Sequence, residues 1–494
     1  MTAFFKTHLF SIGLLLLCSL CYLSFGYGLD REESLQLIGL TVAAFFLTHR
    51  LLVVERKNFR LLLFTGILYR LVLFWSIPEL SQDFYRYIWD GSLYINGINP
   101  YLHKPVDLIT QLTNSIPNAR FLYDKMGELS QNHYSNYPPI SQYVYALAAY
   151  LGQGSIQVSI WIFKSLILGA DLAILFLCRW LMQQLGLPTW KAFWYFLNPL
   201  VIMELSGNLH LEGLMIAFFL AGICAVVYTY KKSQDGWPLE GKQQLDNTRQ
   251  LNDTGKFYGP EWQPQLLIAV CMSLSIMTKL IPILFYPFLI FALGFKRWFT
   301  TGLVILGCSA LLLWPLLGQG FFGYYLETIG LWFHNFEFNA SLYNLIKSIS
   351  KAAGYSGYRT IITYGKVLPF LMITLAMGLL AWQYRQGLKI QNTRMNTMRL
   401  ALCSMLFMYT GHLLIATTVH PWYLIFGLIL SLFTPYRFFV VWSLSVILSY
   451  VTYAIPDFKE NLWILTIEYL FLFGALLYEI VTIKMSDYYS VKNV

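Results

Sequence analysis

Two carboxylates, an arginine and a tyrosine near the start of the stretch 83–101 have the spacing of reactive side chains on one helix. The positions i, i+3, i+4 and i+7 are taken by Asp83, Arg86, Tyr87 and Asp90. A helix would place all four on one face. A carboxylate there could remove the proton of a hydroxyl group as that group attacks another molecule. The stretch therefore predicts a site that binds a polar substrate.

Further polar side chains, far apart in the sequence, are of types that suit a phosphate and a sugar. They are His210 and Glu212 in GNLHLEG, Lys279 in MTKLIP, Asn339 in FEFNASLY, and His420 and Tyr423 in HPWYL. Basic groups and histidine can stabilise the charge that develops on a phosphate leaving group, while amides and aromatic faces suit a sugar. No Asp-x-Asp pair occurs in the segments expected outside the membrane, so neither a metal ion nor another cofactor is predicted.

Each of these residues also has a structural interpretation. The two aspartates could pair with the arginine or cap helix ends, and this interpretation is stronger for Asp90 than for Asp83. Lys279 could extend its ammonium group to the lipid headgroups. The histidine and glutamate of GNLHLEG could mark a solvated turn, and the histidine that precedes a proline in HPWYL could begin a helix.

The composition is that of a protein built for lipid. Of the 494 residues 57% are hydrophobic and 12% are charged, whereas soluble proteins have about 25% charged residues. Apolar runs of about 17–25 residues, long enough to cross a bilayer, recur along the chain. The sequence therefore predicts an all-α polytopic membrane protein, with a single integral-membrane domain over residues 1–494.

The uneven distribution of charge sets the expected orientation. Basic residues concentrate in segments such as 50–60 and 385–399, the second of which has no acidic residue, whereas the segment 30–33 is net acidic. By the positive-inside rule the basic segments face the cytoplasm. The net charge of +9 then reflects topology and does not indicate a nucleic-acid partner. The chain is expected to cross the membrane about 12–14 times, with residue 83 emerging outside.

Three longer segments interrupt the apolar pattern. Residues 79–137 are expected to form a large first external loop, with helices that lie at the membrane interface and carry the catalytic group. Residues 231–263 lack periodicity and are expected to be a flexible cytoplasmic loop. Residues 318–359 form the second large external loop. In this orientation all the candidate residues lie on one side of the membrane, where ionisable groups are costly unless they have a function.

Six short segments, in this order, resemble those of the GT-C superfamily of membrane glycosyltransferases. They are SQDFYRYIWDG, NGINPY, YPP, GNLHLEGLM, FNASLY and HPWYL, spread over about residues 80–425. The nearest type is the bacterial polyprenyl-phosphate-mannose-dependent mannosyltransferases similar to glycosyltransferase family 87. The resemblance implies a GT-C-like helical bundle and an acidic base at the start of the first external loop. That base is Asp83 here, although Gln82 stands where relatives often carry a second acid.

The resemblance also implies that basic residues near the outer surface bind the phosphate of a lipid donor. Arg86, Lys279 and His420 are available for this, and the other candidate side chains would bind substrate around them. The predicted function is therefore a membrane glycosyltransferase. It would move a hexose, expected to be mannose, from a polyprenyl-phosphate sugar to a glycan or lipid acceptor. The site would face the periplasm or exterior from the bacterial inner membrane, in contact with membrane lipids.

Two points on mechanism and class remain open at the level of sequence. One general base is enough for a displacement with inversion, whereas a retaining enzyme of the hydrolase type would want a second carboxylate as nucleophile. The alternative function is a transporter or flippase of a lipid-linked glycan, which polar residues within apolar runs would favour. Those residues are Lys164, Asp171 and Glu468. A scaffold for cell-envelope assembly is the third hypothesis.

Overall fold

The computed structural model describes residues 2–113, 115–234, 262–334, 336–390, 393–455 and 458–483, and its regular elements are helices. Within these residues no β-strand is formed, and one isolated bridge joins Phe338 to Thr418. The all-α prediction is therefore confirmed. The predicted cytoplasmic loop 231–263 lies almost wholly outside the described residues, which include only the end of one helix and the start of the next at its borders.

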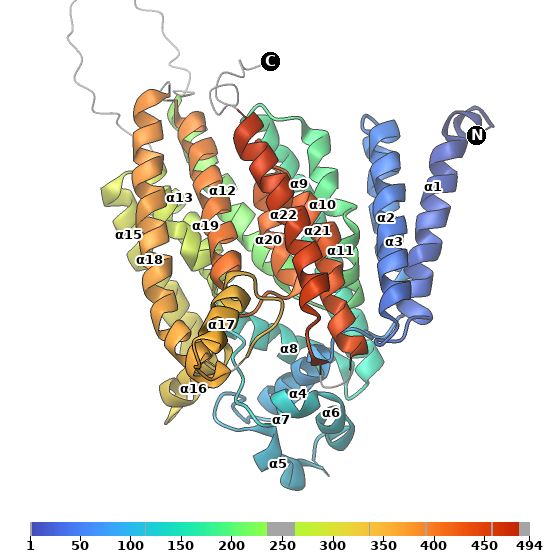
Figure 1. Cartoon of the computed structure of the whole chain (residues 1–494), viewed down its shortest axis with the longest axis vertical. Coiled ribbons are helices and arrows are strands. Elements are labelled where there is room, and N and C mark those ends of the chain that lie inside the picture. The colour runs from blue at the N-terminus through green and yellow to red at the C-terminus, as the bar shows by residue number, and fades with distance from the viewer. Residues whose placement is uncertain are drawn as a thin grey trace, which may run out of the picture.

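Eight helices in the described part of the chain are long and apolar enough to cross a membrane. They are α1 (Thr2–Tyr27), α2 (Ser34–Glu55), α9 (Ile156–Gln184), α12 (Glu212–Gln234), α15 (Phe295–Leu313), α18 (Gly357–Lys389), α19 (Arg394–Ile415) and α22 (Leu462–Thr482). These helices run roughly parallel and form a bundle (Figure 1). Helices of about 20 apolar residues match the thickness of the hydrocarbon layer, so the chain is a polytopic membrane protein as predicted.

Four shorter apolar stretches contribute to the same bundle. They are α13 (Trp262–Thr278), η3 (Ile281–Leu289) with α14 (Ile290–Leu293), η5 (Pro421–Tyr423) with α20 (Leu424–Ser431), and α21 (Phe438–Ser445) with η6 (Val446–Ala454). The predicted count of about 12–14 crossings exceeds the eight described helices that are long enough. An apolar run does not reveal where its helix tightens or breaks, as η3 does around Pro287, because proline has no N–H for the α-helical hydrogen bond.

Irregular buried elements connect the long helices α9 and α12. They are η1 (Thr189–Ala192), α10 (Phe193–Phe196), α11 (Pro199–Val201) and η2 (Ile202–Gly207), and η2 is a turn of π-helix. The residue Leu209 that follows has a φ of 65°, which a leucine adopts only where its surroundings hold it. This buried connection brings residues 208–212 to the inner side of the cavity described below.

A cap of short helices closes one end of the bundle. After α3 (Phe59–Val72) the chain forms α4 (Asp83–Ile95), α5 (Pro105–Leu112), α6 (Ala119–Lys125), α7 (Gly127–Gln131) and α8 (Pro139–Gly152). They lie at the lower end of the bundle in Figure 1. The helix predicted on the spacing of Asp83 to Asp90 is confirmed, and it begins at Asp83.

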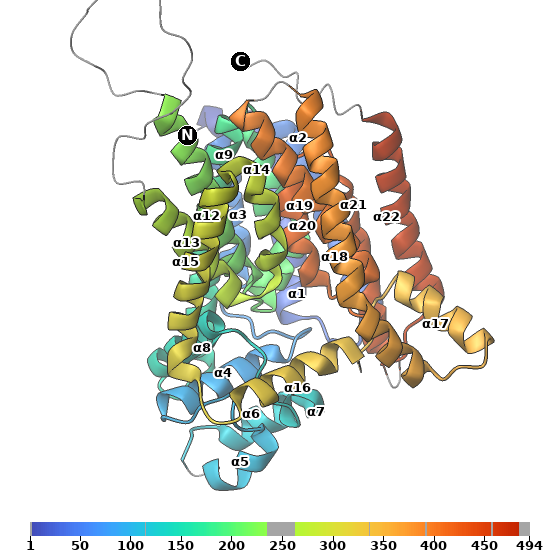
Figure 2. The ribbon, with the colours of Figure 1, turned by 90° about the vertical axis from the view of Figure 1, so that its left-hand side faces the viewer.

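The second segment predicted to be external lies at the same end as the cap. It follows η4 (Trp314–Leu316) and contains α16 (Phe321–His334) and α17 (Leu342–Ala352). Figure 2 shows α16 crossing the lower end of the bundle near α4, with α17 beyond it. The last turn of α18 and the first turn of α19, in the basic segment 385–399, lie at the opposite end. The two segments that were predicted to share one side of the membrane thus share one end of the molecule.

Close packing between α4 and α8 fixes the position of the helix that carries Asp83. The rings of Tyr87 and Tyr145 stack with centroids 4.4 Å apart and an interplanar angle of 5°. One turn further along, Gly91 lies so near α8 that a Cβ atom there would be 2.2 Å from the carbonyl oxygen of Tyr145. Only glycine allows the two backbones to approach this closely.

Candidate active site

A cavity of about 660 Å³ lies between the cap and the end of the helical bundle. Five of the predicted residues line it, although they come from distant parts of the sequence: Asp83, Arg86, Lys279, His420 and Tyr423. The other five predicted residues do not line it: Tyr87, Asp90, His210, Glu212 and Asn339. The structure therefore brings half of the predicted residues together around one space and places the rest behind its walls or beyond it.

Asp83 is the first residue of α4, and its side chain is partly buried. Burial raises the pKa of its carboxyl group above the usual value; the positive charges of Lys279 and Arg31 oppose this rise, and the negative charge of Glu212 adds to it. A carboxylate with a raised pKa is a stronger base than one in water. Asp83 thus has the environment expected of a proton acceptor that faces a cavity.

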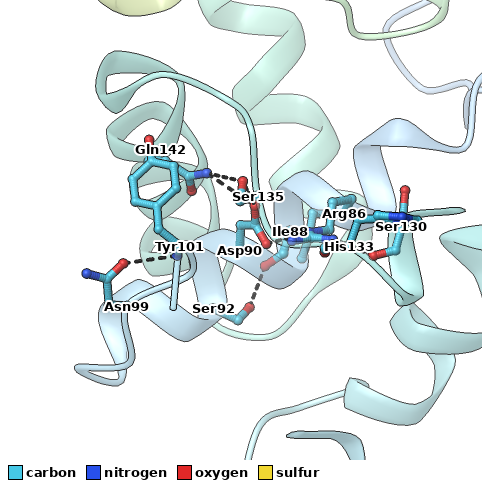
Figure 3. Close-up of polar contacts among 10 residues, drawn as sticks. All are labelled: Arg86, Ile88, Asp90, Ser92, Asn99, Tyr101, Ser130, His133, Ser135 and Gln142. Carbon is cyan, nitrogen blue, oxygen red and sulfur yellow. Dashed lines mark hydrogen bonds and ion pairs between the residues drawn. The ribbon is translucent and has the colours of Figure 1, made fainter. Parts of the chain in front are cut away.

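Arg86 and Asp90 form an ion pair within α4, and both also bind the segment 130–135 (Figure 3). The distance between Arg86 Nε and Asp90 Oδ1 is 2.6 Å, and Arg86 Nη1 also donates to the backbone carbonyls of Ser130 and His133. The other carboxylate oxygen of Asp90 accepts hydrogen bonds from neighbouring side chains on the segment after α7 and on α8: Ser135 and Gln142.

Because Asp90 is fully buried, it does not reach the cavity, contrary to its prediction as a substrate-binding group. The structural interpretation holds for this residue. Arg86 lines the cavity, but most of its guanidinium group is engaged with the protein. Its contribution to the site is to hold the wall formed by residues 130–135 against α4.

Lys279 and Glu212 form an ion pair at the inner side of the cavity. Lys279 follows the last residue of α13, Glu212 is the first residue of α12, and the packing of these two helices brings them together. The glutamate is 1% exposed, whereas the lysine side chain is 17% exposed and lines the cavity. Glu212 therefore does not line the cavity itself, but its ion pair holds the ammonium group of Lys279 in place there.

His420 belongs to a row of stacked rings. Its ring centroid is 4.9 Å from Phe338 on one side and 4.3 Å from Trp422 on the other, and Trp422 stacks on His210 at 3.8 Å. His210 is fully buried, with its Nε2 atom 3.6 Å from Glu204. His210 does not line the cavity but supports the ring row by stacking on Trp422, and its role in binding substrate stays a prediction.

Ionisation limits what His420 can do. Burial, together with the positive charge of Lys279, lowers the pKa of His420 to about 3. The ring is therefore neutral at neutral pH. It can donate one hydrogen bond and accept another, but it offers no positive charge to stabilise a phosphate. Burial likewise lowers the pKa of His210 well below its usual value. Among the residues predicted to bind the phosphate, the positive charge belongs to Lys279 and Arg86.

The last three predicted residues have different surroundings. Tyr423 lines the cavity. Tyr87, one helical turn after Asp83 on α4, is buried and stacks on Tyr145. Asn339 is buried away from the cavity, where its amide donates to Glu468 at 3.1 Å. With a φ of 50°, Asn339 shapes the turn that carries Phe338 to the ring row. Asn339 itself does not line the cavity, so the structure favours a role in positioning the residues before it.

The sequence did not point to Arg31, which also lines the cavity. Its guanidinium carbon lies 4.0 Å from the ring centroid of Tyr453, a geometry that stabilises a cation. Arg31 stands in the sequence Asp-Arg-Glu-Glu, whose composition indicates only a net acidic external turn. One basic residue in a turn on the outer side is the signal that could have identified it.

A metal site was not predicted, and the described residues contain no group of three His, Cys, Asp or Glu side chains that could hold a metal ion. The requirement for a metal stays a matter of prediction, since the substrate can itself supply ligands. The cavity is lined by three carboxylates, three cations and a wall of aromatic rings; besides Asp83, the carboxylates are those of Glu128 and Glu337.

The all-helical bundle with a capped end and a polar cavity beneath the cap defines a polytopic membrane protein with a candidate active site at one end. Within this class, the chain belongs to the family described as alpha-(1->6)-mannopyranosyltransferase, N-terminal domain, whose sequence model matches residues 33–294. The predicted resemblance to mannosyltransferases is thereby confirmed. The matched region contains Asp83, Glu212 and Lys279 and ends before His420.

Curated relatives carry names of the same kind. The chain is 28% identical over 210 residues to alpha-(1->6)-mannopyranosyltransferase A of Mycobacterium tuberculosis, covering 42% of this chain and 39% of the relative. It is 23% identical over 260 residues to a probable alpha-(1->6)-mannopyranosyltransferase of Mycolicibacterium smegmatis, covering 49% and 42%.

A third relative is alpha-(1->6)-mannopyranosyltransferase B of Corynebacterium glutamicum, which is 24% identical over 152 residues, covering 30% of this chain and 24% of the relative. The chain thus spans less than half the length of each of these relatives. No solved structure matches the chain.

Proposed function

We propose that this protein transfers mannose from a polyprenyl-phosphate donor to a hydroxyl group of a glycan or lipid acceptor. The observation that carries the proposal is the meeting of Asp83, Lys279 and His420 around one cavity, although 337 residues separate the first from the last. The family and the names of the relatives support mannose as the sugar and an α-(1→6) linkage as the product.

In the proposed reaction Asp83 acts as the general base. Its carboxylate takes the proton of the acceptor hydroxyl while the hydroxyl oxygen attacks the anomeric carbon of the donor sugar. The bond between that carbon and the phosphate oxygen breaks, and the polyprenyl phosphate leaves with the electron pair. A single displacement of this kind inverts the configuration of the anomeric carbon and needs one carboxylate only.

The cations of the cavity would stabilise the leaving phosphate. Lys279 and Arg31 both lie close enough to influence the charge of Asp83, so a phosphate between them would feel both positive charges as its own charge grows. The ring row of Phe338, His420 and Trp422 offers an apolar wall for the face of a sugar, and the neutral His420 ring can exchange a hydrogen bond with one of its hydroxyl groups.

The transporter alternative loses its main support. Lys164 donates to the carbonyl and hydroxyl oxygens of Ser76 at 2.6 and 3.0 Å. Asp171 forms an ion pair with Arg70 at 2.7 Å, and Glu468 accepts hydrogen bonds from two side chains within the bundle. None of these three residues lines the cavity that contains Asp83. Lys164, Asp171 and one carboxylate oxygen of Glu468 thus bind other parts of the protein, which explains these groups without a transported substrate.

The test is transfer by purified Asp83→Asn protein supplied with polyprenyl-phosphate mannose, with products identified by mass spectrometry. The rate should fall about 100-fold or more, because general-base catalysis contributes about that much. The melting temperature should stay the same or rise, since the pKa of Asp83 is raised in the folded state and ionised Asp83 therefore costs stability at neutral pH.

Asp107→Asn is the matched control, because Asp107 is an exposed carboxylate of the same cap, on α5, and does not line the cavity. It should keep the wild-type rate. Full activity of the Asp83→Asn protein would overturn the assignment of the base. Flux of a lipid-linked glycan across vesicles, without formation of a glycosidic bond by the wild-type protein, would establish the transporter alternative.

A further inference from the structure

A second cavity, of about 230 Å³, is lined by residues at the end of α18 and the start of α19; these parts of the two helices lie at the end of the bundle opposite the cap (Figure 2). It is formed where the last turns of α18 meet the first turns of α19 and the short helix α14. The residues that matter for its chemistry are Phe291, Gln383, Gly387, Leu388, Asn396 and Thr397. Because a water molecule occupies about 30 Å³ of liquid volume, the space admits a chemical group of several heavy atoms.

Gln383, which lines this second cavity, has a side-chain oxygen that receives no hydrogen bond from the described part of the protein. Gln383 is 1% exposed, and its Nε2 atom donates to the carbonyl of Phe288 at 3.1 Å. Its Oε1 atom is buried and accepts no hydrogen bond within the described part of the chain. A buried acceptor without a donor is costly, so the cavity suits a ligand that brings an O–H group to this oxygen.

Among the described residues, none that lines the cavity is charged, but the cavity adjoins a basic segment on one side and apolar side chains on the other. The segment 385–399 carries four basic residues and no acidic one, and the guanidinium group of Arg399 contacts the lining residue Asn396 at 3.4 Å. By contrast, the lining side chains of Leu388 and Phe291 are exposed on the outside of the bundle, at 71% and 41%, where acyl chains would lie. A ligand that fits is anionic, hydroxylated and attached to hydrocarbon.

We propose that this cavity binds an anionic glycerophospholipid whose headgroup carries free hydroxyls, as in phosphatidylglycerol. A headgroup hydroxyl would donate to Gln383 Oε1, and the phosphate would lie toward the basic segment. The acyl chains would run along Leu388 and Phe291. Basic pockets between membrane helices are a recurrent means of binding such headgroups. The lipid comes from the leaflet at the basic end of the bundle, away from the transferase cavity, so this site is independent of the proposed function.

The test compares the lipids that the purified full-length protein retains from a mixture of phosphatidylglycerol and phosphatidylcholine, measured by native mass spectrometry. We expect the wild-type protein to favour phosphatidylglycerol about fivefold or more, the factor that one hydrogen bond supplies. Gly387→Leu should remove the preference, because a Cβ atom at Gly387 meets nothing within 4 Å and the leucine would fill the cavity without displacing the protein.

Gly378→Leu is the matched control, since Gly378 lies in the same helix, also has open space around its Cβ position, and does not line the cavity. It should keep the preference. Gln383→Met, which preserves the volume of the side chain, provides a second variant should Gly387→Leu fail to fold, and it too should lose the preference.

Three outcomes would overturn the proposal. The first is equal retention of the two lipids by the wild-type protein. The second is an unchanged preference in both Gly387→Leu and Gln383→Met. The third is a protein that binds free glycerol 3-phosphate as well as it binds the lipid, because the ligand would then be a soluble polyol phosphate.

Discussion

Burial shifts the ionisation of two cavity residues in opposite directions. The charged form of a carboxyl group is the anion, so burial raises the pKa of Asp83 above its usual value. The charged form of imidazole is the cation, so burial lowers the pKa of His420 to about 3. Because of these opposite shifts, Asp83 is the residue that can accept a proton, whereas His420 stays neutral throughout the reaction.

The pH dependence of transfer follows from these shifts. Only ionised Asp83 can accept the proton, so kcat/KM should fall as the pH drops through its raised pKa, with a limb that lies above the pH expected for an aspartate in water. His420 stays neutral throughout and contributes no limb near its usual value of about 6.5. The measurement is the pH profile of mannose transfer for wild-type protein and for His420→Gln.

The His420→Gln protein should be slower but should keep the acidic limb at the same pH. A limb near pH 6.5 that disappears in this variant would instead make His420 the titrating base. The free energy of unfolding offers an independent check. His420 has a lower pKa when folded, so its contribution to stability is complete above about pH 6.5 and is lost as the pH falls toward about 3. The glutamine variant should lack that part of the acid-induced loss.

Residue types predicted the cavity better than they predicted the part that each residue plays in it. Asp83, Lys279 and His420 were expected to share one site, and they line one cavity. Asp90, His210 and Asn339 were expected at the same site, but they are buried and do not line the cavity. A polar side chain beside an apolar run has the same appearance whether its partner is a ligand or another part of the protein. Only the fold decides between these.

At the scale of elements, the contact between α4 and α8 determines where Asp83 lies. A Cβ atom at Gly91 would be 2.2 and 2.4 Å from the backbone O and C atoms of Tyr145, and backbone cannot move aside as the end of a flexible side chain can. Gly91→Ala should therefore push the two helices apart, destabilise the protein by about 1–3 kcal/mol and reduce transfer. A thermal melt in detergent, followed by the transfer assay, measures both effects.

A matched glycine separates this effect from helix propensity. Gly169 lies within α9, and a Cβ atom there meets nothing within 4 Å. Gly169→Ala should raise the melting temperature, because alanine favours a helix by about 0.5–1 kcal/mol relative to glycine. Equal stabilisation by both substitutions would show that α4 and α8 do not approach as closely as described.

The periodic elements were more predictable than the irregular ones. The i, i+3, i+4, i+7 spacing correctly placed a helix at Asp83, since local geometry alone generates that pattern. The π-helical turn η2 and the break at η3 carry no such pattern. They arise where packed neighbours and prolines prevent a regular helix, which explains why the predicted number of crossings exceeded the number of long described helices.

At the scale of the whole molecule, the two ends of the bundle differ in how many basic residues are concentrated there. The cap with Asp83 forms one end (Figure 1), and the last turn of α18 and the first turns of α19 lie at the other; these turns belong to the segment 385–399, which has four basic residues and no acidic one. By the positive-inside rule the basic end should face the cytoplasm, which would open the cavity to the periplasm or exterior.

Labelling of single introduced cysteines tests this orientation in cells. Asp107 on the cap and Lys389 at the end of α18 are both exposed, and the seven native cysteines are buried or only partly exposed, so the unmodified protein gives the background. A membrane-impermeant maleimide should label Asp107→Cys in intact spheroplasts, and it should label Lys389→Cys only after the membrane is made permeable. The reverse pattern would place Asp83 in the cytoplasm, where the donor would have to present its phosphate from the inner leaflet.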